Sequence, residues 1–225
     1  MPHTHRAALL LAVLLACTAL FFTGWGQEAA NPLSHLNGFA HLGYFALAAW
    51  GLASLPPVAR RPLPAQIALV LTVIAGGGGV IELLQPAFGR SATWNDLGLD
   101  LLGGLLGLLF LAPVRHRLDR RLLFAGRLAV LVLAGLALAG PAAALWDAGR
   151  AAREFPVLAD FASRLEEGRW SHGEVDRTVS RHGPAALRVE LGTEQYAGTT
   201  LKRSLGNWEG YGALAFSVYN PGPEP

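Results

Sequence analysis

Long apolar runs alternate with short polar loops over the first 145 residues. Five runs can be marked, at about residues 7–22, 39–55, 65–84, 97–114 and 122–145. Most of them reach the ~17–25 residues with which a helix crosses about 30 Å of hydrocarbon. The pattern therefore predicts an α-helical membrane bundle of about five transmembrane helices, of which the first two are the shortest.

The pattern changes after Leu145. Residues 146–154 are polar and helical in character, and from residue 155 the helical periodicity gives way to short β-type runs. These runs cover residues 155–161, 175–180, 186–191, 196–201 and 213–219, with Gly, Pro and Asn turns between them. We therefore expect a transmembrane domain at 1–145, a linker at 146–154 and an all-β sandwich at 155–225.

The expected sandwich is small and incomplete. Five strand-like runs are fewer than the roughly seven strands of a two-sheet domain. The sequence also stops soon after the strong run 213–219. We expect either a truncated domain or one whose open edge is covered by a partner.

Composition supports the membrane prediction. The chain has 225 residues, of which 52% are hydrophobic and 15% charged, and its mean hydropathy is +0.36. Soluble domains carry roughly 25% charged residues, so the lipid bilayer is the expected environment. The isoelectric point near 9.0 comes from arginines in short loops rather than from a nucleic-acid-binding motif, and no nucleic-acid partner is predicted. Cys17 is the single cysteine, which excludes an intramolecular disulfide.

The arginines predict the orientation, because loops rich in Arg and Lys stay in the cytoplasm. Seven of them lie on one side of the predicted bundle: Arg6, Arg60, Arg61, Arg115, Arg117, Arg120 and Arg121. The short loops on the opposite side contain Arg90 alone. We expect a multi-pass protein of the plasma (inner) membrane, with a cytoplasmic N-terminus and residues 155–225 outside the cytoplasm.

The first run resembles a signal sequence with a lipoprotein processing site at Cys17. The apolar run continues past this cysteine to Phe22, however. An uncleaved membrane anchor is the preferred interpretation, and the orientation of the later runs is the same in either case.

Polar residues interrupt the apolar pattern around residues 82–107. Glu82 and Gln85 share one helix face, and Asp96 and Asp100 share another, together with Gly103 and Gly107. Two helices joined by the short turn that contains Arg90 would point these acids into a common space. His41 enters the predicted membrane from the same side. Ionisable groups at the margins of membrane helices are costly, so the candidate cluster is His41, Glu82, Gln85, Arg90, Asp96 and Asp100.

These residues resemble the VanZ-like family of small membrane proteins over about residues 30–115. The shared pattern is an early His41, Glu82-x-x-Gln85, the turn Gly89-Arg90, then Asp96, Asp100, Gly103 and Gly107. Asn37-Gly38 stand where family members often have Asp-Lys, and Asp100 stands where many have Asn. The resemblance implies a cell-envelope protein linked to resistance against the glycopeptide teicoplanin.

The C-terminal part resembles jelly-roll carbohydrate-binding-like domains. Aromatic residues and the run HGPAALRVEL, residues 182–191, carry this likeness. It implies a weak sugar-binding candidate set of Trp170, Trp208 and Tyr211. Such aromatics are more often packing residues of a sheet than binding residues.

Three functions fit the sequence. The preferred one is a non-catalytic envelope protein whose outer domain recognises cell-wall glycan or another partner and whose polar cluster is ion-paired structural glue. The alternative is an intramembrane enzyme acting on a lipid-linked phosphate or glycan at the outer leaflet, with the cluster supplying acid–base groups. A transporter is disfavoured, because the sequence contains no internal repeat. A divalent metal bound by His41, Glu82, Asp96 and Asp100 is chemically feasible, but neither a metal nor a cofactor is assigned.

The orientation can be tested with reporter fusions. A reporter enzyme that works only outside the cytoplasm should be active when fused after Pro225 and inactive when fused within the 113–121 loop. Activity after Pro225 of a reporter that works only in the cytoplasm would reject the predicted topology.

Overall fold

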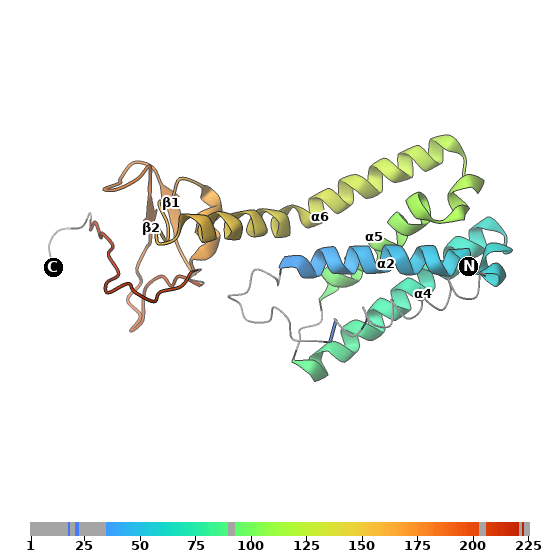
Figure 1. Cartoon of the computed structure of the whole chain (residues 1–225), viewed down its shortest axis with the longest axis horizontal. Helices are drawn as coiled ribbons and strands as arrows, with labels where there is room; N and C mark the ends of the chain where they lie inside the picture. The colour runs from blue at the N-terminus through green and yellow to red at the C-terminus, as the bar shows by residue number, and fades with distance from the viewer. Residues whose placement is uncertain are drawn as a thin grey trace. The chain divides into compact units, whose positions relative to one another are not determined.

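The computed structural model describes residue 18 and residues 21–22, 35–89, 93–202, 206–220 and 222. Its elements are mainly helices (Figure 1). The chain divides into two compact units, Met1–Ala142 and Ala143–Pro225. Each unit is described by itself below.

The first unit is helical. Its elements, in chain order, are α2 (Asn37–Ser54), α3 (Pro56–Ala59), α4 (Leu63–Leu84), the 3₁₀ turn η2 (Gln85–Phe88), α5 (Trp94–Leu106), the π-helical turn η3 (Gly107–Leu111), the 3₁₀ turn η4 (Pro113–Arg117) and the start of α6 (Arg120–Glu154). Proline at the start of α3, α4, η2 and η4 favours these boundaries, since its missing N–H costs nothing there.

Within the described residues, three helical stretches are long and apolar enough to cross a membrane. They are Leu63–Phe88, Trp94–Leu111 and Arg120–Glu154. The second predicted run forms α2, but polar residues such as Asn37 and His41 lower its hydropathy, and it is not among the three. Of the first predicted run, the structure describes only Thr18, Phe21 and Phe22. The expected count of five is therefore corrected to three among the described residues.

Gly103 in α5 and Gly107 at the start of η3 let this helical stretch pack directly on the backbone of α2. A methyl group built on Gly103 would lie 2.5 Å from the carbonyl oxygen of Leu42, and one built on Gly107 would overlap that of Ala46. No residue larger than glycine fits at this distance without moving a helix. The Gly103-x-x-x-Gly107 spacing therefore fixes how closely α2 and α5 approach.

Apolar side chains from α2, α4 and the turns η3 and η4 fill the core of this unit. Ala49, Val70, Leu108 and Val114 are almost completely buried there. A second cluster joins Leu102 of α5 to Val130 and Ala134 of α6. These contacts hold α2, α4 and α5 side by side, so polar residues near their ends come together.

The two arginine-bearing loops meet at one end of the first unit. Arg117 donates to the carbonyl oxygens of Ala59 and Arg61, and to Oε1 of Gln66 at 2.9 Å. Gln66 is buried and donates in turn to the carbonyl oxygen of Ala53 at 3.0 Å. Arg117 therefore satisfies free carbonyl groups in the α3 loop, a structural role that its place in a basic loop did not predict.

Helix α6 continues past the predicted linker. It runs without interruption from Arg120 to Glu154 and contains Pro141. The expected linker at 146–154 is therefore part of a helix that begins in the first unit and ends in the second. Arg150 and Glu154, one turn apart, form an ion pair that supports this polar last turn.

The second unit is not the expected β-sandwich. Over its described residues it contains η5 (Arg164–Arg169) and one antiparallel pair of three-residue strands, β1 (Glu174–Asp176) and β2 (Ala186–Arg188). A single bridge joins Trp170 to Leu201. The five expected strands are thus reduced to one short hairpin-like pair.

Residues 213–219 explain much of this difference. Their alternating sequence is that of a strand, but they pair with no other strand among the described residues. Leu214, Phe216 and Val218 are 60%, 79% and 81% exposed. Alternation specifies a strand only when a neighbouring strand completes its backbone hydrogen bonds and covers one face.

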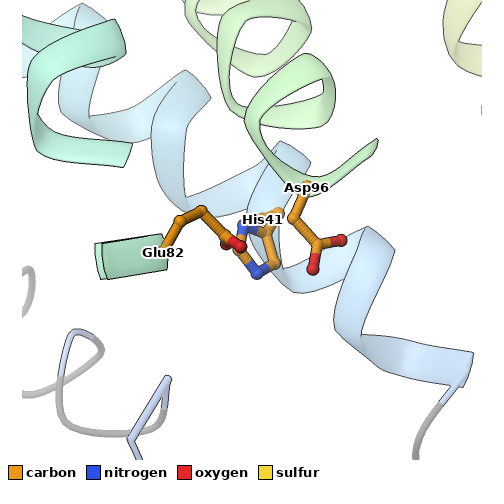
Figure 2. A group of neighbouring side chains, drawn as sticks. All are labelled: His41, Glu82 and Asp96. Carbon is orange, nitrogen blue, oxygen red and sulfur yellow. The ribbon is translucent and has the colours of Figure 1, made fainter. Parts of the chain in front are cut away.

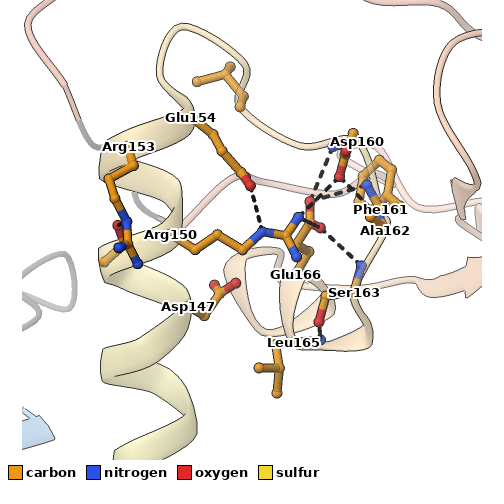
Figure 3. A network of polar contacts seen from close by, with 12 residues as sticks. Asp147, Arg150, Arg153, Glu154, Asp160, Phe161, Ala162, Ser163, Leu165 and Glu166 are labelled. Carbon is orange, nitrogen blue, oxygen red and sulfur yellow. Dashed lines mark hydrogen bonds and ion pairs between the residues drawn. The ribbon is translucent and has the colours of Figure 1, made fainter.

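A buried carboxylate organises the second unit instead of a sheet. Glu166 is fully buried and accepts a hydrogen bond from Arg150 at 2.7 Å (Figure 3). It also accepts from the backbone N–H groups of Asp160, Phe161 and Ser163. Every oxygen of this carboxylate is therefore occupied, as a buried charge requires.

A second buried pair ties α6 to the same turn. Arg169 donates to both oxygens of Asp147, with both distances 2.7 Å, and to the carbonyl oxygen of Leu158. Nearby, a hydrogen bond from the N–H of Ala162, together with the charge of Arg150, holds the pKa of Asp160 below its usual value. Two arginines thus join the last turns of α6 to residues 158–169.

Glu166→Gln should destabilise the second unit by about 3 kcal/mol, because it leaves Arg150 without its buried partner. Thermal or denaturant unfolding of the purified protein, followed by tryptophan fluorescence, measures this loss. The control is Glu190→Gln, since the Glu190 side chain is 84% exposed and its change should stay within about 0.5 kcal/mol. Equal stability of both variants would contradict the assigned role of Glu166.

Candidate functional site

Three elements of the first unit bring the predicted polar residues to one place. His41 lies on α2, Glu82 near the end of α4, and Asp96 and Asp100 on α5. All four are buried, as is Gln85 in η2. The predicted site residue Arg90 lies outside the described residues. Of the predicted residues, the structure brings His41, Glu82 and Asp96 together, with one potential ligating atom of each within 4.8 Å of the others.

A hydrogen bond between His41 and Asp100 forms the base of the site. Nδ1 of His41 lies 2.7 Å from Oδ1 of Asp100, and both side chains are 0% exposed. The imidazole also contacts two aromatic rings, edge-on with Phe21 and roughly stacked with Phe45. Apolar walls exclude water, so the polar contact inside is stronger than it would be in solvent.

The turn before α5 orients two acids, Glu82 near the end of α4 and Asp96 near the start of α5. Thr93 caps α5, and its hydroxyl accepts the backbone N–H of Asp96 at 3.0 Å. The backbone N–H of Thr93 donates to Oε2 of Glu82 at 2.7 Å. One residue therefore links the end of α4 to the start of α5 and orients Glu82.

His41, Glu82 and Asp96 converge on a common point. One potential metal-ligating atom from each lies within 4.8 Å of the others. Figure 2 shows the carboxylates of Glu82 and Asp96 on either side of the His41 ring. These three side chains, from three different helices, are called the His–Glu–Asp cluster below.

Five polar atoms around this cluster have no hydrogen-bond partner among the described residues. They are Nε2 of His41, Oε1 of Glu82, Oδ2 of Asp100, and both amide atoms of Gln85. An unsatisfied buried polar atom costs about 1–3 kcal/mol, so the five together cost on the order of the whole stability of a domain. Each of these atoms calls for a partner, which a bound ligand, ion or water molecule would supply.

The carboxylates of the site have few partners of opposite charge among the described residues. Glu82, Asp96 and Asp100 are three acids, and the one basic side chain that contacts any of them in the described structure is His41, which hydrogen-bonds Asp100. No described arginine or lysine forms an ion pair with them, in contrast to Glu166 and Asp147 in the second unit. The site therefore attracts a cation or a hydrogen-bond donor.

One of the four consecutive glycines of α4 makes room for Asp100. A methyl group built on Gly78 would overlap Oδ2 of Asp100 and lie 3.3 Å from its Cβ, whereas Gly76, Gly77 and Gly79 have open space. Helix α4 is continuous through all four residues. The glycine run therefore serves close packing rather than local unwinding of the helix. Within the run, Gly78 is the residue that makes the close contact.

The aromatic candidates of the second unit have packing roles. Trp208 and Tyr211 both contact Phe155 edge-on, with ring centroids 5.4 Å away. Trp170 packs near Phe161 and bridges to Leu201. The sugar-binding set expected from these residues stays a prediction.

Sequence reasoning missed Thr93 and the individual importance of Gly78. A signal existed for Thr93, because Thr-x-x-Asp before an apolar run is a helix-start pattern. None existed for Gly78, since its neighbours in sequence are identical glycines. The choice among them depends on which one faces Asp100.

Comparisons with protein-family models, curated proteins and solved structures give no match. The site is therefore interpreted from its own geometry.

Gly78→Ala should destabilise the first unit by about 1–3 kcal/mol, because the added methyl group displaces Asp100 from His41. Unfolding of the detergent-solubilised protein measures this change. Gly77→Ala is the matched control, with open space around it and a gain of up to about 1 kcal/mol from helix propensity. Indistinguishable effects of the two variants would show that Gly78 has no special contact.

Proposed function

We propose that this chain is a multi-pass protein of the cell-envelope membrane, of the VanZ-like type, which binds the polar head group of a lipid-linked envelope precursor. One observation carries the proposal. Unsatisfied polar atoms of His41, Glu82 and Gln85 gather from separate elements in an otherwise apolar helical unit. A binding site accounts for the free-energy cost of burying these atoms, whereas a purely structural network of ion pairs does not.

The surfaces of the helices support the membrane assignment. Leu83 on α4 is 81% exposed, and α6 exposes Phe124, Leu131 and Leu136 outside the face on which Val130 and Ala134 pack against α5. A helix that is apolar on all sides belongs in lipid or in the core of a larger protein. The three apolar helical stretches are each long enough for a membrane of ordinary thickness.

The arginine bias supports a site at the outer leaflet. His41 lies near the start of α2, Glu82 near the end of α4 and Asp96 near the start of α5. The loops containing Arg61 and Arg117 join the other ends of these helices. If those loops are cytoplasmic, the cluster lies at the opposite side, where head groups of exported precursors are found.

The second candidate function is catalysis on such a precursor. A specific observation favours it: Asp100 hydrogen-bonds Nδ1 of His41, and Nε2 has no hydrogen-bond partner among the described residues. A histidine oriented in this way is suited to accept or donate a proton. Binding is the main proposal because no serine, cysteine or lysine among the described residues hydrogen-bonds to His41, whose described side-chain partner is Asp100.

Resistance to teicoplanin is the cellular role that the VanZ-like resemblance suggests. In cells lacking the protein, expression of Glu82→Gln or Asp96→Asn should give normal membrane levels and no protection against teicoplanin. The reason is that each variant keeps the size of the side chain and removes its charge from the site.

The matched control is Glu190→Gln, an exposed acid of the second unit, which should protect as well as the unchanged protein. Membrane level is measured by quantitative immunoblotting and protection by the inhibitory drug concentration. If the membrane level of the variants fell in proportion to their protection, the cluster would have only a structural role, and the proposal would be wrong.

A further inference from the structure

We propose that the His–Glu–Asp cluster binds one divalent transition-metal ion. Its donors are one imidazole nitrogen and two carboxylate oxygens, from His41, Glu82 and Asp96. This set suits Zn²⁺ or Mn²⁺ better than Mg²⁺ or Ca²⁺, which prefer oxygen ligands alone.

The spacing of the donors fits a single ion. One donor atom from each side chain lies within 4.8 Å of the other two. Ligands about 2.1 Å from a tetrahedral ion are about 3.5 Å from one another. Binding would draw the donor atoms together by up to about 1.3 Å.

Each of two ligands is already oriented by an outer hydrogen bond. Asp100 holds Nδ1 of His41 at 2.7 Å and leaves Nε2 for the ion. The backbone N–H of Thr93 holds Oε2 of Glu82 and leaves Oε1 for the ion. A carboxylate behind a histidine ligand is the usual arrangement at metal sites, where it fixes the ring and makes the free nitrogen more basic.

The unpartnered atoms are an observation independent of the donor spacing. His41 is completely buried, and its Nε2 has no hydrogen-bond partner among the described residues. A divalent ion would bind this nitrogen and Oε1 of Glu82 together. It would also offset the negative charge of three carboxylates for which the described residues supply only His41.

The ion also resolves a difficulty in the proposed function. A cluster of carboxylates repels a phosphate head group, whereas a metal with three protein ligands keeps coordination positions open for phosphate oxygens. The inference rests on the proposed function in one respect, because it places the metal ion and the lipid head group at the same site. It also revises the expectation from sequence, which assigned no metal, and it gives Asp100 a positioning role behind His41 instead of a place among the ligands.

Metal binding is tested on the full chain, purified in detergent and stripped with a chelator. Titration with Zn²⁺, Mn²⁺ and, as a spectroscopic probe, Co²⁺ should show one equivalent bound per chain. Glu82→Gln and Asp96→Asn should each lose most of this binding. Asp100→Asn should weaken it by about 10–100-fold, because the loss acts through the orientation of His41.

Glu190→Gln is again the control and should bind as the unchanged protein does. Folding of every variant is checked by gel filtration and thermal unfolding, and the unchanged protein should gain thermal stability on adding metal. Absence of stoichiometric binding to the folded, unchanged protein overturns the inference, even if a variant fails to fold. Equal binding by Glu82→Gln, Asp96→Asn and the control overturns it as well.

Metal content and drug protection separate the two proposals. Stoichiometric metal at the cluster, with teicoplanin protection intact in Glu82→Gln and Asp96→Asn, would remove the proposed function and leave the metal site. Protection lost in these variants, with no metal bound by the unchanged protein, would remove the metal site and leave the proposed function.

Discussion

The hydrogen bond between His41 and Asp100 sets the conditions for the rest of the first unit. Two polar side chains with no exposure to solvent can lie 2.7 Å apart only if α2 and α5 approach closely. Gly103 and Gly107 permit this approach to α2, and Gly78 leaves space for Asp100 on the side of α4. Three helices are therefore shaped around one polar contact.

The two units differ in how completely their buried carboxylates are hydrogen-bonded. In the second unit, Glu166 receives an arginine and three backbone N–H groups, so its charge is fully satisfied and its role is structural. In the first unit, Glu82 receives one backbone N–H at one oxygen, and its other oxygen has no partner among the described residues. This difference, more than the presence of acids, makes the cluster in the first unit a candidate binding site.

Polar side chains at the two ends of the helices in the first unit are arranged differently. At one end, Arg117 bonds to carbonyl groups of the α3 loop and to buried Gln66, which itself has a second partner. At the other, Nε2 of His41 and Oε1 of Glu82 have no hydrogen-bond partner among the described residues, and a carboxylate oxygen of Asp96 lies near them. The first arrangement is satisfied within the protein, whereas the second leaves buried polar atoms whose cost a bound ligand would offset.

The sequence by itself determined the apolar runs that became α4, α5 and α6, and it placed Glu82, Gln85, Asp96 and Asp100 on common helix faces. Periodicity suffices for this, since a helix repeats every 3.6 residues whatever surrounds it. It did not determine the pairing of His41 with Asp100, the choice of Gly78 among four glycines, or the failure of residues 213–219 to join a sheet. Those depend on contacts between segments far apart in the chain, and only the tertiary structure decided them.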